Sequence, residues 1–137
     1  MWNDQAKLEE FIQDYLFPSS VLSWAKNVKR ALYKPTYSTT VAINCNNGEH
    51  HTITATNATN FTINAPTNPP SSAQAADLTI EVYNDTAAAL GTITWNAAYE
   101  FNGFTYVSPG AGLRSFARFH WNGLHWICNS VSTVAYS

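Results

Sequence analysis

The feature that most constrains the fold of this chain is a change in hydrophobic period near residue 36. Before that point apolar side chains recur every three or four residues, a spacing typical of helices. After it they alternate with Thr, Asn, Ser or Glu, as in Val41, Ile43 and Cys45. A strand with one buried face has this alternation, so the sequence predicts about eight short strands after residue 36.

Turn-forming residues separate the expected strands and favour an all-β domain. Asn46–Gly48, Pro109–Gly110 and Asn122–Gly123 are examples. Asn122–Gly123, between two aromatic runs, indicates a two-residue type I′ hairpin, whose central positions both need positive φ. The sequence has no internal repeat that would indicate a solenoid. We therefore expect a mainly β chain: an antiparallel β-sandwich or jelly-roll-like domain over residues 36–137, preceded by a short α-helical segment over residues 1–35.

The segment 1–35 contains two predicted amphipathic helices, with Pro18 between them. Two short amphipathic helices cannot bury their apolar stripes alone, so they need a partner surface. That surface is either another protein chain or the β-domain of the same chain. In the first case the candidate partner-binding residues are the apolar stripe of the first helix and two residues of the second: Leu8, Phe11, Ile12, Tyr15, Leu16, Trp24 and Val28.

Composition and charge exclude several classes of partner. The formal net charge is -2 and only 12% of the 137 residues are charged. Binding to nucleic acid needs clustered Lys and Arg, which this chain lacks, and no apolar run reaches the length of a membrane span. No signal peptide is evident, so we expect synthesis in the cytoplasm without secretion. The two cysteines, Cys45 and Cys128, are expected to be buried free thiols.

Residue patterns for enzyme chemistry are weak. There is no Gly-x-Ser-x-Gly motif for a nucleophilic serine. The candidate carboxylates are Asp77, Glu81, Asp85 and Glu100, but Asp77 and Glu81 would lie about 13 Å apart along one strand, too far for a glycosidase pair. We predict a non-enzymatic protein without a cofactor.

The histidines offer one metal-site candidate. His50 and His51 are adjacent, so on a strand they point to opposite faces. His120 and His125 flank the predicted hairpin turn, with Cys128 nearby, but no further ligand follows at a motif spacing. We predict no metal site here and expect these histidines to pack among aromatic residues.

Aromatic residues crowd the last third of the chain and allow two interpretations. Exposed rings on a neutral Asn- and Thr-rich sheet can stack on sugars. The candidate glycan-binding residues are Tyr99, Phe101, Phe104 and Tyr106. The interpretation we favour is that the rings fill the core of the domain and a contact between subunits.

One resemblance covers about two-thirds of the chain. It is carried by Asn68–Pro70, by Asp77–Asn84, by Gly91–Asn96, by the aromatic segment Tyr99–Phe104, and by Phe116–Gly123 with Trp126. In this order of strands and turns, Val41–Asn129 resembles a small β-domain that recurs in virion proteins of tailed bacteriophages, including tail-fibre modules, minor structural proteins and head fibres. Arg114, Arg118 and His120 depart from that pattern.

The resemblance implies a structural role in a virion, often as a homotrimer and without chemistry of its own. We expect a capsid decoration, cement or head-fibre protein on the capsid surface, bound to the major capsid protein or another virion protein through residues 1–35. The alternative is a glycan- or receptor-binding module of a phage fibre, with a cell-surface glycan as its partner.

Overall fold

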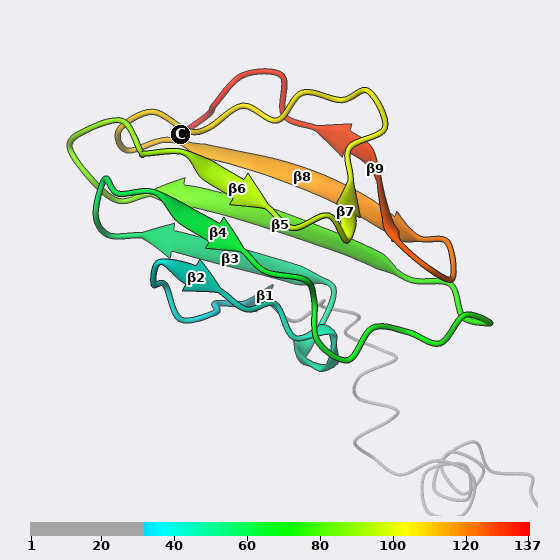
Figure 1. Cartoon of the computed structure of the whole chain (residues 1–137). Helices are drawn as coiled ribbons and strands as arrows, with labels where there is room; N and C mark the ends of the chain where they lie inside the picture. The colour runs from blue at the N-terminus through cyan, green and yellow to red at the C-terminus, as the bar shows by residue number, and fades with distance from the viewer. Residues whose placement is uncertain (1–31) are drawn as a thin grey trace, which may run out of the picture. The chain divides into compact units, whose positions relative to one another are not determined.

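The computed structural model describes residues 32–137, which are mainly β (Figure 1). Most of the predicted helical segment 1–35 lies outside the described part. Its last residues are described and are not helical, because Leu32–Tyr33 is a strand. The described strands are β1 (Leu32–Tyr33), β2 (Thr40–Val41), β3 (His50–Ala55), β4 (Phe61–Ile63), β5 (Asp77–Asn84), β6 (Ile93–Trp95), β7 (Tyr99–Glu100), β8 (Arg114–Trp121) and β9 (Trp126–Val131), with a short 3₁₀ helix, η2 (Cys45–Asn47). No helix among residues 32–137 is long and apolar enough to cross a bilayer.

The strands form two sheets, and the chain alternates between them as it winds. A six-stranded sheet has the order β1-β3-β5-β8-β9-β7, and a three-stranded sheet has the order β2-β4-β6. Consecutive strands from β1 to β6 lie in different sheets, and each of β1 to β4 pairs in parallel with the strand two places later. Figure 1 shows the short strands β2, β4 and β6 running alongside one another. This part of the chain winds like the coils of a parallel β-solenoid.

The prediction of an antiparallel, jelly-roll-like sandwich is wrong for most of these pairings. Within residues 32–137, five strand pairs are parallel and only β5 with β8 and β8 with β9 are antiparallel. Alternation with period two identifies a strand and its buried face, but it carries no information about strand direction. The loops after β3, β4 and β5 take the chain across to the opposite sheet, so the coiled winding was missed.

The predicted hairpin at Asn122–Gly123 is confirmed, although its turn differs. β8 and β9 pair as antiparallel neighbours. Of the two turn residues only Gly123 has a positive φ, 97°. Asn122 instead accepts hydrogen bonds at Oδ1 from the backbone N–H groups of Leu124 and His125, at 2.9 and 2.7 Å. The loop therefore has four residues and is closed by the Asn122 side chain, which takes the place of a type I′ turn.

Both sheets contribute their inner faces to one core. In β5 the alternation is complete: residues 78, 80, 82 and 84 are buried, while 77, 79, 81 and 83 face outward. Burial of these apolar side chains is the main favourable term for folding. The buried core residues are Val41, Ile43, Ile53, Ala55, Phe61, Ile63, Leu78, Ile80, Val82, Tyr99, Ala117, Phe119, Trp126 and Cys128.

The connection from β5 to β6 is held by one buried amide. Asn84 is fully buried, and its Nδ2 donates to the carbonyls of Ala88 and Pro109, at 2.8 and 3.2 Å. Its Oδ1 accepts from the backbone N–H and the hydroxyl of Thr86. A buried amide with all these partners stabilises the loop that carries the chain to the other sheet.

Candidate functional site

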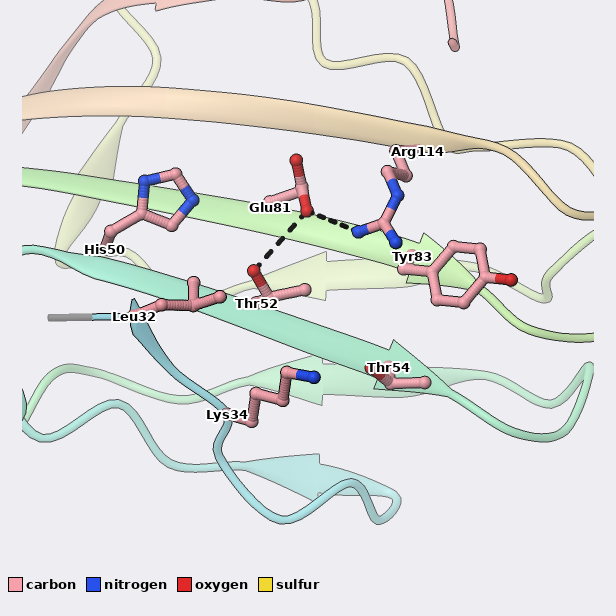
Figure 2. Close-up of a pocket in the computed structure, with 8 residues that line it drawn as sticks. All are labelled: Leu32, Lys34, His50, Thr52, Thr54, Glu81, Tyr83 and Arg114. Carbon is pink, nitrogen blue, oxygen red and sulfur yellow. Dashed lines mark hydrogen bonds and ion pairs between the residues drawn. The ribbon is translucent and has the colours of Figure 1, made fainter. Parts of the chain in front are cut away.

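A groove on the outer face of the six-stranded sheet brings together polar side chains from four strand regions. Its volume is about 340 Å³, at the small end of the range for ligand pockets. We call it the outer-face groove, and Figure 2 shows the side chains that line it: Leu32, Lys34, His50, Thr52, Thr54, Glu81, Tyr83 and Arg114.

Strand register explains why these residues meet. On β5 every second residue faces outward, and the parallel register sets Thr52 and Thr54 of β3 beside Glu81 and Tyr83. Thr54 is half-buried and Thr52 is buried. The antiparallel pairing of β5 with β8 then sets Tyr83 opposite Arg114. Side chains directly opposite on neighbouring strands are close enough to interact. The groove therefore depends on segments that are distant in the sequence.

Glu81 is the centre of the hydrogen bonding in the groove. Its Oε1 accepts from Arg114 Nη1 at 2.8 Å and from Thr52 Oγ1 at 3.4 Å, as the dashed lines in Figure 2 mark. Its Oε2 accepts from the hydroxyl of Tyr136 at 2.7 Å. Burial and this bond to Glu81 raise the pKa of Tyr136 to about 12. Both oxygens of the carboxylate are thus occupied, which fixes its position.

Arg114 is held on a second side by an aromatic ring. Its guanidinium carbon lies 4.2 Å from the centre of the Tyr83 ring, a distance at which a cation and a ring attract each other. The Tyr83 hydroxyl in turn donates to Asp85 Oδ1 at 3.3 Å. Arg114 is therefore a positioned cation, with its charge balanced by Glu81.

Lys34 supplies the second cation of the outer-face groove. It is exposed, and it makes no ion pair with any residue between 32 and 137. In Figure 2 it follows β1 on the side of the groove opposite Arg114, with Thr52 and Thr54 between them. The groove thus has a compensated cation at one end and an uncompensated one at the other.

The predicted partner-binding residues of the helical segment are not part of this site. Leu8, Phe11, Ile12, Tyr15, Leu16, Trp24 and Val28 all lie outside the residues that the structure describes. Their role stays a prediction.

The candidate glycan-binding rings are mostly inside the domain. Tyr99 is buried and its hydroxyl donates to the Asn64 carbonyl, while Phe101 and Tyr106 are half-buried and pack against the core. Burial raises the pKa of both tyrosine hydroxyls well above their ordinary value. Only Phe104 of the four is exposed. The structure therefore does not bring these four rings together as an open stacking face.

The histidine and carboxylate candidates are dispersed. His125 Nδ1 pairs with Glu100 Oε1 at 2.5 Å. No cluster of three or more His, Cys, Asp or Glu side chains that could hold a metal occurs among residues 32–137. The described cysteines are free; Cys128 is buried and Cys45 half-buried. Burial raises the pKa of both thiols, which makes them poor nucleophiles.

Sequence reasoning missed the groove as a unit. In the sequence Glu81 stands out only as a candidate catalytic carboxylate, and Arg114 only as a departure from a family pattern. The usable signal was the alternation of side chains along a strand, because Glu81 and Tyr83 are two residues apart on one strand and must share a face. Nothing in the sequence paired that face with Thr52 or Lys34.

No family model, curated protein or solved structure matches this chain in comparisons of sequence and fold. The resemblance of Val41–Asn129 to phage virion domains thus depends on its pattern of strands and turns alone.

Proposed function

We propose that this chain is a non-enzymatic virion component, a capsid decoration, cement or head-fibre protein. The predicted helices that precede β1 bind the capsid exterior or sister subunits. Residues 36–137 form the β-sandwich that is displayed on the particle. The partner is the major capsid protein or another virion protein, and the chain itself associates as a homotrimer.

The observation that carries the proposal is the edge strand β1. It pairs with β3 over only two residues, and its side chains Leu32 and Tyr33 are 57% and 37% exposed. A sheet edge with exposed apolar side chains is a surface that readily contacts another chain. This edge directly follows the segment that carries the predicted docking stripe. Both features support a contact region at the N-terminal end of the domain.

The outer face of the three-stranded sheet supports display at high density. Thr40, Thr62 and Thr94 lie side by side across its three strands, and Thr40 and Thr94 are exposed. A face of small hydroxyl side chains adds no charge repulsion between copies that are crowded on one surface.

The test changes the docking stripe within the full chain. We expect Leu8→Asp with Phe11→Asp to abolish the trimer. Light scattering after size exclusion measures this, since a trimer has about three times the 15.1 kDa mass of one chain. Ala6→Asp with Gln13→Asp adds the same charge on the face of the predicted helix opposite the stripe and should leave the trimer intact. Antibodies against residues 32–137 should also label the outside of phage capsids by electron microscopy. A monomeric wild-type chain and unlabelled capsids would contradict the proposal.

A second candidate function, a glycan- or receptor-binding module, is supported by a different observation. The outer-face groove is a small polar hollow with fixed charges, which suits a soluble ligand. The rings from Tyr99 to Tyr106 do not supply this support, because three of the four are packed inside.

A further inference from the structure

The outer-face groove has an uneven arrangement of charge. Arg114 and Lys34 lie at opposite ends, with Thr52, Thr54 and Glu81 between them (Figure 2). Glu81 neutralises Arg114 through their 2.8 Å ion pair. Lys34 has no such partner among residues 32–137. The groove therefore has a surplus positive charge, which favours an anionic ligand.

The remaining side chains favour a ligand that carries hydroxyl groups. Thr54 offers a hydroxyl and His50 a ring nitrogen, and both can donate or accept hydrogen bonds. Leu32, at the edge of the groove, offers an exposed apolar surface for C–H groups. The hydroxyl of Thr52 is already bonded to Glu81. Such a mixture of neutral polar groups, one apolar contact and one free cation matches a sugar ring with an acid group.

Pre-formed geometry lowers the cost of binding at this site. Glu81 accepts bonds from three side chains, and Arg114 is further held by the ring of Tyr83. These groups do not need to be ordered when a ligand arrives. Glu81, Arg114 and Tyr83 keep their positions when the ligand binds, while the exposed side chain of Lys34 contacts the acid group.

We propose that the outer-face groove binds an acidic saccharide, a sugar that carries a carboxylate. The carboxylate pairs with Lys34, and the ring hydroxyls bond to Thr54 and His50. This inference gives a ligand class to the glycan-binding candidate, and it does not require attachment to a virion. Binding of a free sugar is measured without any particle, so failure here and failure of the capsid role are separate results.

The experiment titrates the full chain with D-glucuronate and follows backbone amide signals by NMR. D-glucose, which has the hydroxyls but no charge, and inorganic phosphate, which has the charge but no ring, are titrated in parallel. We expect saturable shifts around Lys34 and Thr54 with glucuronate, and binding at least about tenfold weaker for both comparison ligands. Equal binding of glucose or of phosphate, or no shifts in the groove, overturns the proposal.

Two variants locate the site. Lys34→Gln should weaken glucuronate binding about tenfold, since it removes a charge-assisted hydrogen bond, and Lys34→Arg should restore most of it. Arg118→Gln is the matched control: Arg118 is an exposed cation on β8 that lines no part of the groove and pairs with no described acid. Equal losses in Lys34→Gln and Arg118→Gln would show general charge attraction and overturn the assignment. Unchanged melting temperatures confirm that the variants fold.

Discussion

The two sides of the six-stranded sheet use aromatic side chains in opposite ways. On the core side the rings gather around Trp95, which belongs to β6 of the opposite, three-stranded sheet. Its ring centre lies 5.0 to 5.8 Å from those of four other rings: Tyr99, Phe101, Tyr106 and Phe119. On the outer side, the Tyr83 ring instead lies under the guanidinium of Arg114. The inner ring cluster stabilises the fold, and the outer ring fixes a charge at the edge of a groove.

This contrast shows that residue type is a poor guide to function in a sheet. Neighbouring residues on β8 belong to different environments, because Phe119 is buried while Arg118 is exposed. The dense aromatic segment suggested a sugar-stacking face, yet it fills the interior. The side chains suited to binding are ordinary Thr, Lys and Glu residues that the strand register gathers on the other face.

The largest expected effect comes from removing a ring of the inner cluster. Phe119 is fully buried, so Phe119→Ala should lower the free energy of unfolding by about 3 to 5 kcal/mol. Phe104, at 41% exposed, is the control, and Phe104→Ala should change it by less than about 0.5 kcal/mol. Urea denaturation followed by tryptophan fluorescence measures both. Similar losses for the two variants would mean that Phe104 also belongs to the packed cluster.

A smaller effect is expected from the carboxylate of the groove. Glu81→Gln removes the charge that pairs with Arg114 and should cost about 1.5 kcal/mol, a modest value because Arg114 is 36% exposed. Asp77→Asn, a change of the same kind at an exposed position of the same strand, should cost far less. The same urea experiment measures both. If Asp77→Asn were equally harmful, the loss would reflect the charge of the whole face and not the bonds to Glu81.

The sequence predicted the buried face of each strand well and the partners of each strand poorly. Leu78, Ile80 and Val82 were expected on one face of one strand, and all three are buried. Their alternation follows from local geometry, which a sequence records directly. The direction of a strand and its neighbours are decided by where the loops lead, and a loop of given length can close a hairpin or cross to another sheet.

The outer-face groove could not be predicted for the same reason. Glu81 and Arg114 are 33 residues apart in the sequence, and Glu81 and Tyr136 are 55 apart. No spacing rule connects such residues, since their contact depends on a parallel pair and an antiparallel pair formed on either side of β5. The alternation of side chains along one strand could place Glu81 and Tyr83 on the same face. That Arg114 and Lys34 lie beside them follows only from the pairing of the strands in three dimensions.

The last prediction concerns His51, which neighbours the groove residue His50 but points into the core. His51 is fully buried; its Nε2 lies 2.9 Å from the Gly48 carbonyl, and its Nδ1 has no partner. Burial lowers the pKa of His51, the bond to Gly48 opposes this in part, and the charge of His50 lowers it further. The unfolded chain therefore takes up this proton first as the pH falls.

The free energy of unfolding is therefore at its full value above the ordinary histidine pKa of about 6.5, and it declines as the pH falls below that value. The total loss is about 1.4 kcal/mol for each unit by which the pKa of His51 in the folded chain lies below its value in the unfolded chain. We expect His51→Gln, which keeps a donor for Gly48, to flatten the change in urea midpoint between about pH 7.5 and pH 5.5. His120→Gln, at an exposed position of β8, should leave that change as it is in the wild type. If His51→Gln kept the wild-type dependence of the urea midpoint on pH, the pH response would belong to the histidines of the outer face. The two sides of the sheet would then not differ in this respect.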